Sequence, residues 1–232
     1  MFQKIVISLV PLLLFFGMNL RNGEEFVNNN DPNSDYNFER LYFSLNKNDL
    51  ESPKLLPYKK AMRGFFEYKF KGLIKGEKLV IIDFSLPSTQ KRLWVIDFAT
   101  NSIIYHTLVS HGKGTGNINA YSFSNEMHSN KSSLGFYLTG ETYIGKHGIS
   151  LKLDGLEFGL NDKARERAVV IHGAEYVSRK LANKQGYLGR SQGCPAVATA
   201  IAPKLIQTIK NKSVLFIYHP TRIYVNKSKL VS

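Results

Sequence analysis

The amino-acid sequence predicts a mainly β domain that follows a small N-terminal helical element. Beyond residue 75, short runs of β-branched and aromatic residues recur, and Gly, Asn and Asp residues that favour turns separate them. Nearer the N-terminus, apolar residues recur at helical spacing instead. This change of pattern divides the chain into a helical element at 36–75 and a larger domain at 76–225.

The helical element is expected in two pieces. Phe38, Leu41 and Leu45 recur at helical spacing in the first piece, and prolines separate it from the second. Gly72 is the expected end of the second piece, because glycine is common just after a helix.

The larger domain is expected to consist of short strands joined by turns. The expected strands are 79–84, 93–98, 103–109, 135–139, 150–153, 168–171 and 214–218. Residues 99–102 supply a turn between two of these strands, which predicts a hairpin. The apolar segment 196–210 is the part of this domain that is expected to form a helix instead of a strand.

Residues 1–20 are typical of an export signal. Lys4 provides a sparse basic start, and residues 5–16 carry no charge but are too few to span a bilayer comfortably. No small-x-small cleavage site follows, so an uncleaved anchor is an alternative to a cleaved signal peptide, and a buried helix is the alternative without export. Residues 21–35 are polar and predict a flexible tether. We therefore expect an exported protein, either free or tethered to a membrane.

The chain is strongly basic, with 31 Lys and Arg residues against 18 Asp and Glu residues and a formal net charge of +13. Such a charge favours an anionic partner. Nucleic acid is one candidate, but the basic residues are scattered and no nucleic-acid-binding module accompanies them. The sequence therefore favours loose attraction to an acidic surface or polymer, and no nucleic-acid partner is expected.

Cys194 is the only cysteine of the chain, so it can form no internal disulfide. A lone thiol in an exported protein suggests reactivity, and a thiol nucleophile needs a nearby base or positive charge. His172 can be that base, Arg190 can add positive charge, and Gly193 lets the backbone approach a substrate carbonyl. Each of these residues also fits a structural role, as a buried cysteine, a hydrogen-bonded histidine or a turn glycine.

Two other chemistries are disfavoured. The histidines and the single cysteine show no spacing typical of zinc ligands, so neither a metal site nor another cofactor is expected. Residues 189–193 match Gly-x-Ser-x-Gly around Ser191, but this part of the chain lacks the strand-turn-helix setting of serine hydrolases.

The pair His172-Gly173, followed by Ser191-Gln192-Gly193-Cys194, resembles the signature of the L,D-transpeptidase catalytic domain. Segments 130–137, 155–157, 161–162 and 189–196 resemble the murein L,D-transpeptidase catalytic-domain branch in particular, and the resemblance covers about residues 60–220. It implies a β-sandwich catalytic domain, secretion to the periplasm or cell envelope, and peptidoglycan stem peptides as partners.

The resemblance also implies the roles of four residues. Cys194 would be the nucleophile and His172 the general base and then acid. The amides of Gly193 and Cys194 would bind the oxyanion, and the Gly173 carbonyl would orient the histidine. The thiolate would attack the third, L-configured residue of a tetrapeptide stem and release the terminal D-alanine. An amine of a second stem would then take the acyl group, which makes a 3-3 cross-link.

The loop before Cys194 departs from the family pattern at two positions. Gln192 stands where many relatives carry a second histidine, and Ala196 stands where many carry Arg or Asn. Arg190 is the expected replacement for holding the stem carboxylates, with a structural role as the alternative. Ser191 is expected to shape the loop or to touch substrate.

Two other functions stay open at this point. The same acyl-enzyme could pass to water, as in an L,D-carboxypeptidase or a cell-wall amidase. A non-catalytic peptidoglycan-binding module would keep the fold without turnover. Under the enzyme hypotheses, we expect Cys194 to react with alkylating reagents faster than an ordinary exposed thiol at neutral pH.

Overall fold

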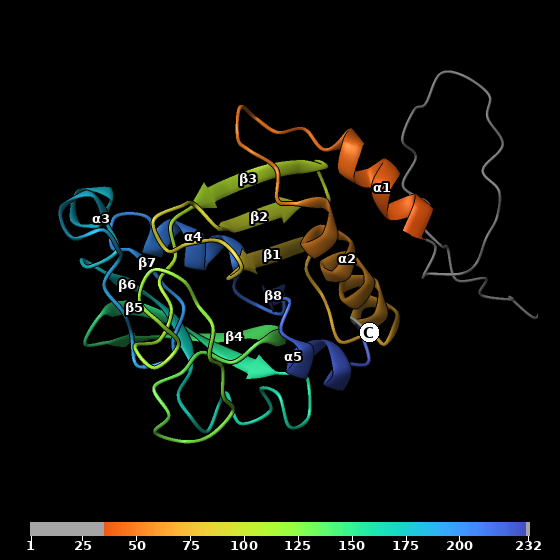
Figure 1. Cartoon of the computed structure of the whole chain (residues 1–232). Coiled ribbons are helices and arrows are strands. Elements are labelled where there is room, and N and C mark those ends of the chain that lie inside the picture. Colours follow the sequence, from red (N-terminus) through yellow and green to blue (C-terminus); the bar gives the residue numbers. More distant parts are fainter. Residues whose placement is uncertain (1–34, 231–232) are drawn as a thin grey trace, which may run out of the picture. The chain divides into compact units, whose positions relative to one another are not determined.

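The computed structural model describes residues 35–230 (Figure 1). The predicted export signal at 1–20 and nearly all of the predicted tether at 21–35 lie outside these residues. Within residues 35–230, no helix is long and apolar enough to cross a membrane.

Two helices form the N-terminal element, α1 (Asp35–Ser44) and α2 (Leu55–Phe70). Phe38 of α1 is buried, and its ring stacks on Phe66 of α2 with centroids 5.8 Å apart. Gly72 follows the end of α2 in the left-handed conformation, at φ +70°. The prediction of a helical element that stops near Gly72 is therefore confirmed.

Eight strands form one sheet in the order β3-β2-β1-β8-β4-β5-β6-β7. They are β1 (Lys78–Asp83), β2 (Leu93–Asp97), β3 (Ser102–Thr107), β4 (Gly135–Gly145), β5 (Gly148–Gly155), β6 (Val170–Ala174), β7 (Ala196–Ala198) and β8 (Val214–Tyr218). β1 is parallel to β8 and β6 is parallel to β7, whereas the other neighbours are antiparallel. The mainly β class and the expected hairpin of β2 and β3 are confirmed.

The core lies where α2 packs against the middle of the sheet, beside β1 and β8 (Figure 1). Phe136 of β4 stacks on Phe216 of β8 at 4.2 Å between centroids, and Tyr68 of α2 meets the Phe136 ring edge at 5.7 Å. A Cβ atom on Gly64 would come within 2.2 Å of the same ring. The close approach of helix and sheet therefore depends on the missing side chain at Gly64.

The segment 196–210 differs from its prediction as one helix. Its first residues form β7, and the helix α4 (Ala202–Ile209) begins later. Ala196 pairs with His172 of β6, so tertiary pairing overrides the helical pattern of these apolar residues. The helix can start only after this strand has ended.

Two short helices, α3 (Arg179–Gln185) and α5 (Arg222–Lys227), were not expected from the sequence. Each is too short to show a clear apolar period. Each begins at a hydroxyl cap: Ser178 accepts a hydrogen bond from the Leu181 amide, and Thr221 accepts one from the Tyr224 amide. Local capping, rather than periodicity, marks these helices in the sequence.

The two ends of the sheet approach each other through the segment that follows β3. The Ser110 amide donates to the Ala196 carbonyl at 2.8 Å, and the Ser191 amide donates to the His111 carbonyl at 3.0 Å. The Lys113 amide in turn donates to the Ser191 carbonyl at 2.8 Å. We call these three contacts the seam; they curl the sheet toward a barrel and hold residues 190–194, the Cys194 loop.

Candidate active site

The parallel pair β6 and β7 brings His172 and Cys194 together. His172 lies inside β6, which extends further than the strand predicted at 168–171, and it pairs with Ala196, two residues after Cys194. Both side chains line one pocket of about 620 Å³. Residues that are 22 positions apart in the sequence therefore share one cavity because their strands are neighbours.

The imidazole of His172 is buried and has a fixed orientation. Its Nδ1 atom lies 2.9 Å from the Gly173 carbonyl oxygen. Because a carbonyl can only accept, Nδ1 carries the hydrogen, and Nε2 is left with the lone pair of a base. The Gly173 carbonyl, which the resemblance implies as the group that orients the histidine, therefore contacts Nδ1 of His172.

His147 is not among the site residues expected from the sequence, yet its ring stacks on that of His172. The centroids are 4.5 Å apart and the ring planes are inclined by 25°. His147 lies in the turn between β4 and β5, so no spacing pattern in the sequence connects it with His172. Burial, and then the nearby His147 and Lys146, lower the pKa of His172, which keeps the imidazole neutral.

The Cys194 thiol is partly covered and donates to the Ala168 carbonyl, with 3.7 Å between Sγ and oxygen. Burial raises the pKa of Cys194, although the amides of Val170 and Cys194 itself and the Arg167 guanidinium act in the opposite direction. The resting thiol is therefore protonated at neutral pH. This direction runs against the expectation of fast alkylation, which rested on the single thiol and its expected base and did not include the burial of the thiol.

Ser191 and Gly193 fix the shape of the Cys194 loop. Gly193 has φ +129°, and its amide donates to Ser191 Oγ at 3.0 Å. Ser191 Oγ donates in turn to the Cys194 carbonyl at 2.6 Å. Ser191 thus shapes the loop, and the Gly193 amide has a partner within it. The amides of Gly193 and Cys194 were both expected to bind an oxyanion. Because the Gly193 amide already donates to Ser191 Oγ, the Cys194 amide is the remaining candidate for this role.

Arg190 lines the pocket but its guanidinium turns toward the neighbouring loop. Nη1 donates to the Gly116 carbonyl at 3.3 Å and to Asn117 Oδ1, and the guanidinium carbon lies 5.6 Å from the Tyr187 ring centroid. These contacts match the structural alternative considered for Arg190 from the sequence.

Arg167 is a second arginine of the pocket, and sequence reasoning missed it. Its Nη2 atom donates to the Lys131 carbonyl at 2.6 Å, and its Nη1 atom donates to the Ser124 carbonyl at 2.7 Å. It lies just before β6 and reaches across to the 124–133 loop. The only signal in the sequence was its position five residues before His172, which alone does not point to a role.

The comparisons with known proteins identify the family of the chain. Residues 50–218 match the family model described as the L,D-transpeptidase catalytic domain, which is more than half of the chain. The chain belongs to the L,D-transpeptidase catalytic domain family. Members of this family are peptidoglycan-modifying enzymes that act on the cell wall outside the cytoplasm. No curated protein matches the sequence.

Several solved structures resemble the fold at low identity. A mutant of the helical cell shape determining protein Pgp2 from Campylobacter jejuni is 16% identical, with a TM-score of 0.42 over 70% of this chain and 55% of that chain. An L,D-transpeptidase from Mycobacterium smegmatis is 12% identical, with a TM-score of 0.38 over 62% of this chain and 59% of that chain. An L,D-transpeptidase from Stackebrandtia nassauensis is 13% identical, with a TM-score of 0.36 over 72% and 67%.

The two departures from the L,D-transpeptidase pattern have different settings. Gln192 is exposed and lines the pocket. Ala196 is fully buried in β7, where it pairs with both His172 and Ser110. A long side chain such as arginine would not fit there without a change in the surrounding strands.

The family segment at 155–162 serves the scaffold rather than the pocket. Asn161 is fully buried, and its Nδ2 atom donates to the carbonyls of Leu134 and Phe136 at 3.0 and 2.9 Å. Its Oδ1 atom accepts from the Glu157 amide at 2.9 Å.

Within residues 35–230, no cluster of three or more His, Cys, Asp and Glu side chains is arranged to hold a metal ion.

Proposed function

We propose that the protein is an L,D-transpeptidase that forms a Cys194 thioester with a peptidoglycan stem peptide. One observation carries this proposal: His172, oriented by the Gly173 carbonyl, shares a pocket with the single thiol of the chain. A base with an unprotonated Nε2 in the same pocket as a thiol supplies the two groups that nucleophilic acyl transfer requires. The family match supports the choice of peptidoglycan as substrate.

The reaction begins from a neutral pair. Nε2 of His172 takes the thiol proton while Sγ of Cys194 attacks the carbonyl of the third, L-configured stem residue. The developing oxyanion is held by the Cys194 amide. The imidazolium then returns the proton to the departing D-alanine amine, which leaves the acyl group on sulfur.

In the second half, an amine of another stem attacks the thioester. His172 accepts the proton of this amine, and sulfur leaves as the thiol, so the product is a 3-3 cross-link. If water takes the place of the amine, the same steps release a tripeptide stem, as in a carboxypeptidase. No cofactor takes part in this proposal.

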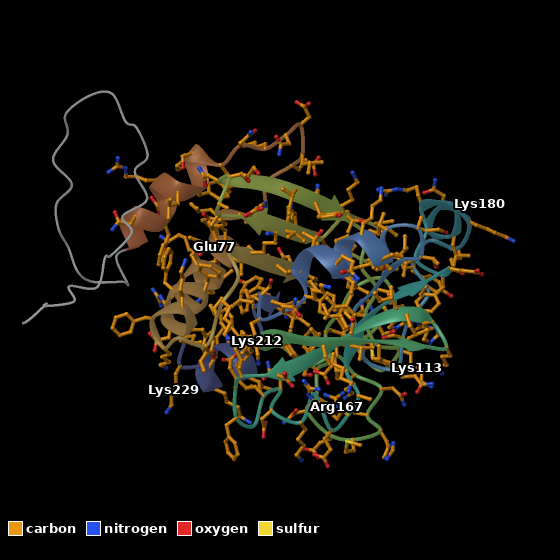
Figure 2. All side chains as sticks on the ribbon, turned by 180° about the vertical axis from the view of Figure 1, so that it is seen from behind. Glu77, Lys113, Arg167, Lys180, Lys212 and Lys229 are labelled. Carbon is orange, nitrogen blue, oxygen red and sulfur yellow. The ribbon has the colours of Figure 1, made fainter. Side chains whose placement is uncertain are left out.

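The proposed setting is the cell envelope, with residues 76–225 as the catalytic domain and residues 1–20 as signal or anchor. The net charge of +13 supports attraction to an acidic wall polymer. Figure 2 shows the labelled side chains of Lys113, Lys180 and Lys229 at different sides of the domain. This spread fits loose attraction better than a focused nucleic-acid interface.

The test incubates the full chain with a tetrapeptide stem and follows protein and products by mass spectrometry. Cys194-dependent acylation with stem dimers is the expected result, and tripeptide alone would assign a hydrolase instead. Cys194→Ala should show neither adduct nor product. His172→Ala should lose acylation as well. His106→Ala should keep acylation, because His106 lies in β3 and stacks on Trp94 of β2. If the unmodified chain binds cell wall but turns over no stem peptide, the proposal is wrong and the protein is a non-catalytic peptidoglycan-binding module.

A further inference from the structure

Arg167 is a cation whose hydrogen-bond partners in the described structure are all neutral. Besides the two carbonyls given above, Nη1 donates to Ser133 Oγ at 3.1 Å and Nη2 donates to Ser129 Oγ at 3.4 Å. By contrast, Arg165 forms ion pairs with both Glu141 and Asp154. Neutral partners orient a guanidinium without cancelling its charge. Glu126, Tyr137 and Cys194 act on Arg167 electrostatically without a hydrogen bond to it.

What lies beside Arg167 is the Cys194 loop. Its Nη2 atom lies 3.5 Å from the position that a Cβ atom on Gly193 would occupy. The Lys131 carbonyl, to which Nη2 donates, lies 2.9 Å from that same position. The guanidinium therefore lies against the backbone of Gly193, the residue immediately before the proposed nucleophile. Figure 2 labels Arg167, near the ribbons of β4 and β5.

The other charged and titratable groups of the pocket are less suited to stabilise a thiolate. Burial keeps His172 neutral, and Arg190 is turned toward Gly116 and Asn117. The remaining titratable groups that line the pocket are His128, Tyr143, Lys146, His147, Glu166 and Tyr176. Arg167 and Cys194 influence each other electrostatically, because each shifts the pKa of the other toward its charged form.

We propose that Arg167 is a positioning residue that stabilises the Cys194 thiolate formed when His172 takes the thiol proton. Its fixed charge compensates for the burial that disfavours this anion. The inference rests on the proposed function, in which Cys194 is the nucleophile, and it assigns to Arg167 the role that the sequence suggested for Arg190.

The test measures the rate at which iodoacetamide alkylates the full chain across pH. Cys194 is the only cysteine, so the rate reports this thiol alone. In Arg167→Gln, the profile should move to higher pH, and alkylation at neutral pH should slow about tenfold, the effect of losing one nearby cation. Arg167→Lys keeps the charge and should restore most of the rate. Arg165→Gln is the matched control, since it removes the same charge from an ion-paired site, and its profile should not move.

An unchanged midpoint in Arg167→Gln would overturn the inference, as would an Arg167→Lys profile that coincides with that of Arg167→Gln. Either result would leave Arg167 with a structural role only, in which its hydrogen bonds hold the 124–133 loop in place. If Arg167→Gln does not fold, Arg167→Met takes its place, because methionine keeps an unbranched side chain without the charge: a midpoint at higher pH supports the inference, and one equal to that of the unmodified chain overturns it. Acylation by the tetrapeptide is scored separately, so a failed transpeptidase proposal with a shifted profile is distinguishable from a failed role of Arg167.

Discussion

Burial acts on Cys194 and His172 in a concerted way, since it disfavours the charged form of both side chains. The pKa of the thiol is raised and the pKa of the imidazole is lowered, so the proton rests on sulfur. Such a pair differs from a preformed thiolate and imidazolium. The proton moves only when substrate arrives, and general-base catalysis by His172 becomes the step to probe.

The first prediction concerns the acidic limb of the pH–rate profile for acylation. His172 acts as a base only when neutral, and its pKa lies below the ordinary value of 6.5. Activity should therefore persist at pH 6.5 and fall as the pH drops through the lowered pKa. His147→Phe keeps a ring over His172 but removes a neighbouring charge, so the limb should move to higher pH. A limb that stays in place would show that His147 does not tune the base.

The second prediction concerns Ser191, whose hydroxyl joins the Gly193 amide to the Cys194 carbonyl. Ser191→Ala leaves a buried amide without a partner, which should lower the free energy of unfolding by about 1–3 kcal/mol. Urea unfolding measures this loss. Gln192→Ala is the control in the same loop, because its side chain is exposed and its removal should change stability by less than about 0.5 kcal/mol. Equal losses in both variants would contradict the role of Ser191.

At the scale of elements, the central strands and the helix α2 were predictable because each carries its own pattern. β1 and β8 are continuous apolar runs, and α2 shows a helical period. β7 was not predictable, since only its pairing with β6 makes a strand of Ala196–Ala198. His147 and Arg167 reach the pocket through a turn and a loop whose positions depend on the whole sheet. Sequence thus indicated the proposed nucleophile and base but not the neighbouring groups that shift their pKa values.

The third prediction tests the contact between α2 and the sheet. Gly64→Ala places a Cβ atom within 2.2 Å of the Phe136 ring, so the helix and sheet must move apart. Overpacking of this kind should destabilise the fold by about 1–3 kcal/mol. Phe70→Ala at the end of the same helix is the control, because Phe70 is 87% exposed. The midpoint of thermal unfolding compares the two, and a Gly64→Ala variant as stable as the parent would refute this account of the core.

At the scale of the whole molecule, Glu157 connects the C-terminal segment to the sheet. Its carboxylate accepts from the Phe136 amide at 2.8 Å, from the Tyr224 hydroxyl at 3.2 Å and from Ser228 Oγ. Burial nevertheless raises the pKa of Glu157. Because the folded pKa exceeds the ordinary value of 4.5, this group contributes most to stability below pH 4.5 and loses that contribution as the pH rises through the folded pKa.

The fourth prediction follows from that sign. Glu157→Gln keeps an acceptor for the Phe136 amide but cannot ionise, so its stability should not decline between acidic and neutral pH through this group. The free energy of unfolding of the unmodified chain should fall relative to that of the variant over the same range. Urea titrations at several pH values provide the measurement. Two parallel curves would mean that Glu157 keeps an ordinary pKa in the folded state.

The seam should determine the temperature at which the protein loses activity. It holds the Cys194 loop by a few backbone hydrogen bonds, whereas the aromatic core lies elsewhere, beside α2. Local opening of such contacts requires less free energy than global unfolding. On gentle warming, acylation should therefore be lost before circular dichroism changes, and cooling should restore it. The temperature at which catalysis is lost would then be set by local opening of the seam. Substitutions that strengthen the seam would extend the temperature range of activity without altering the core.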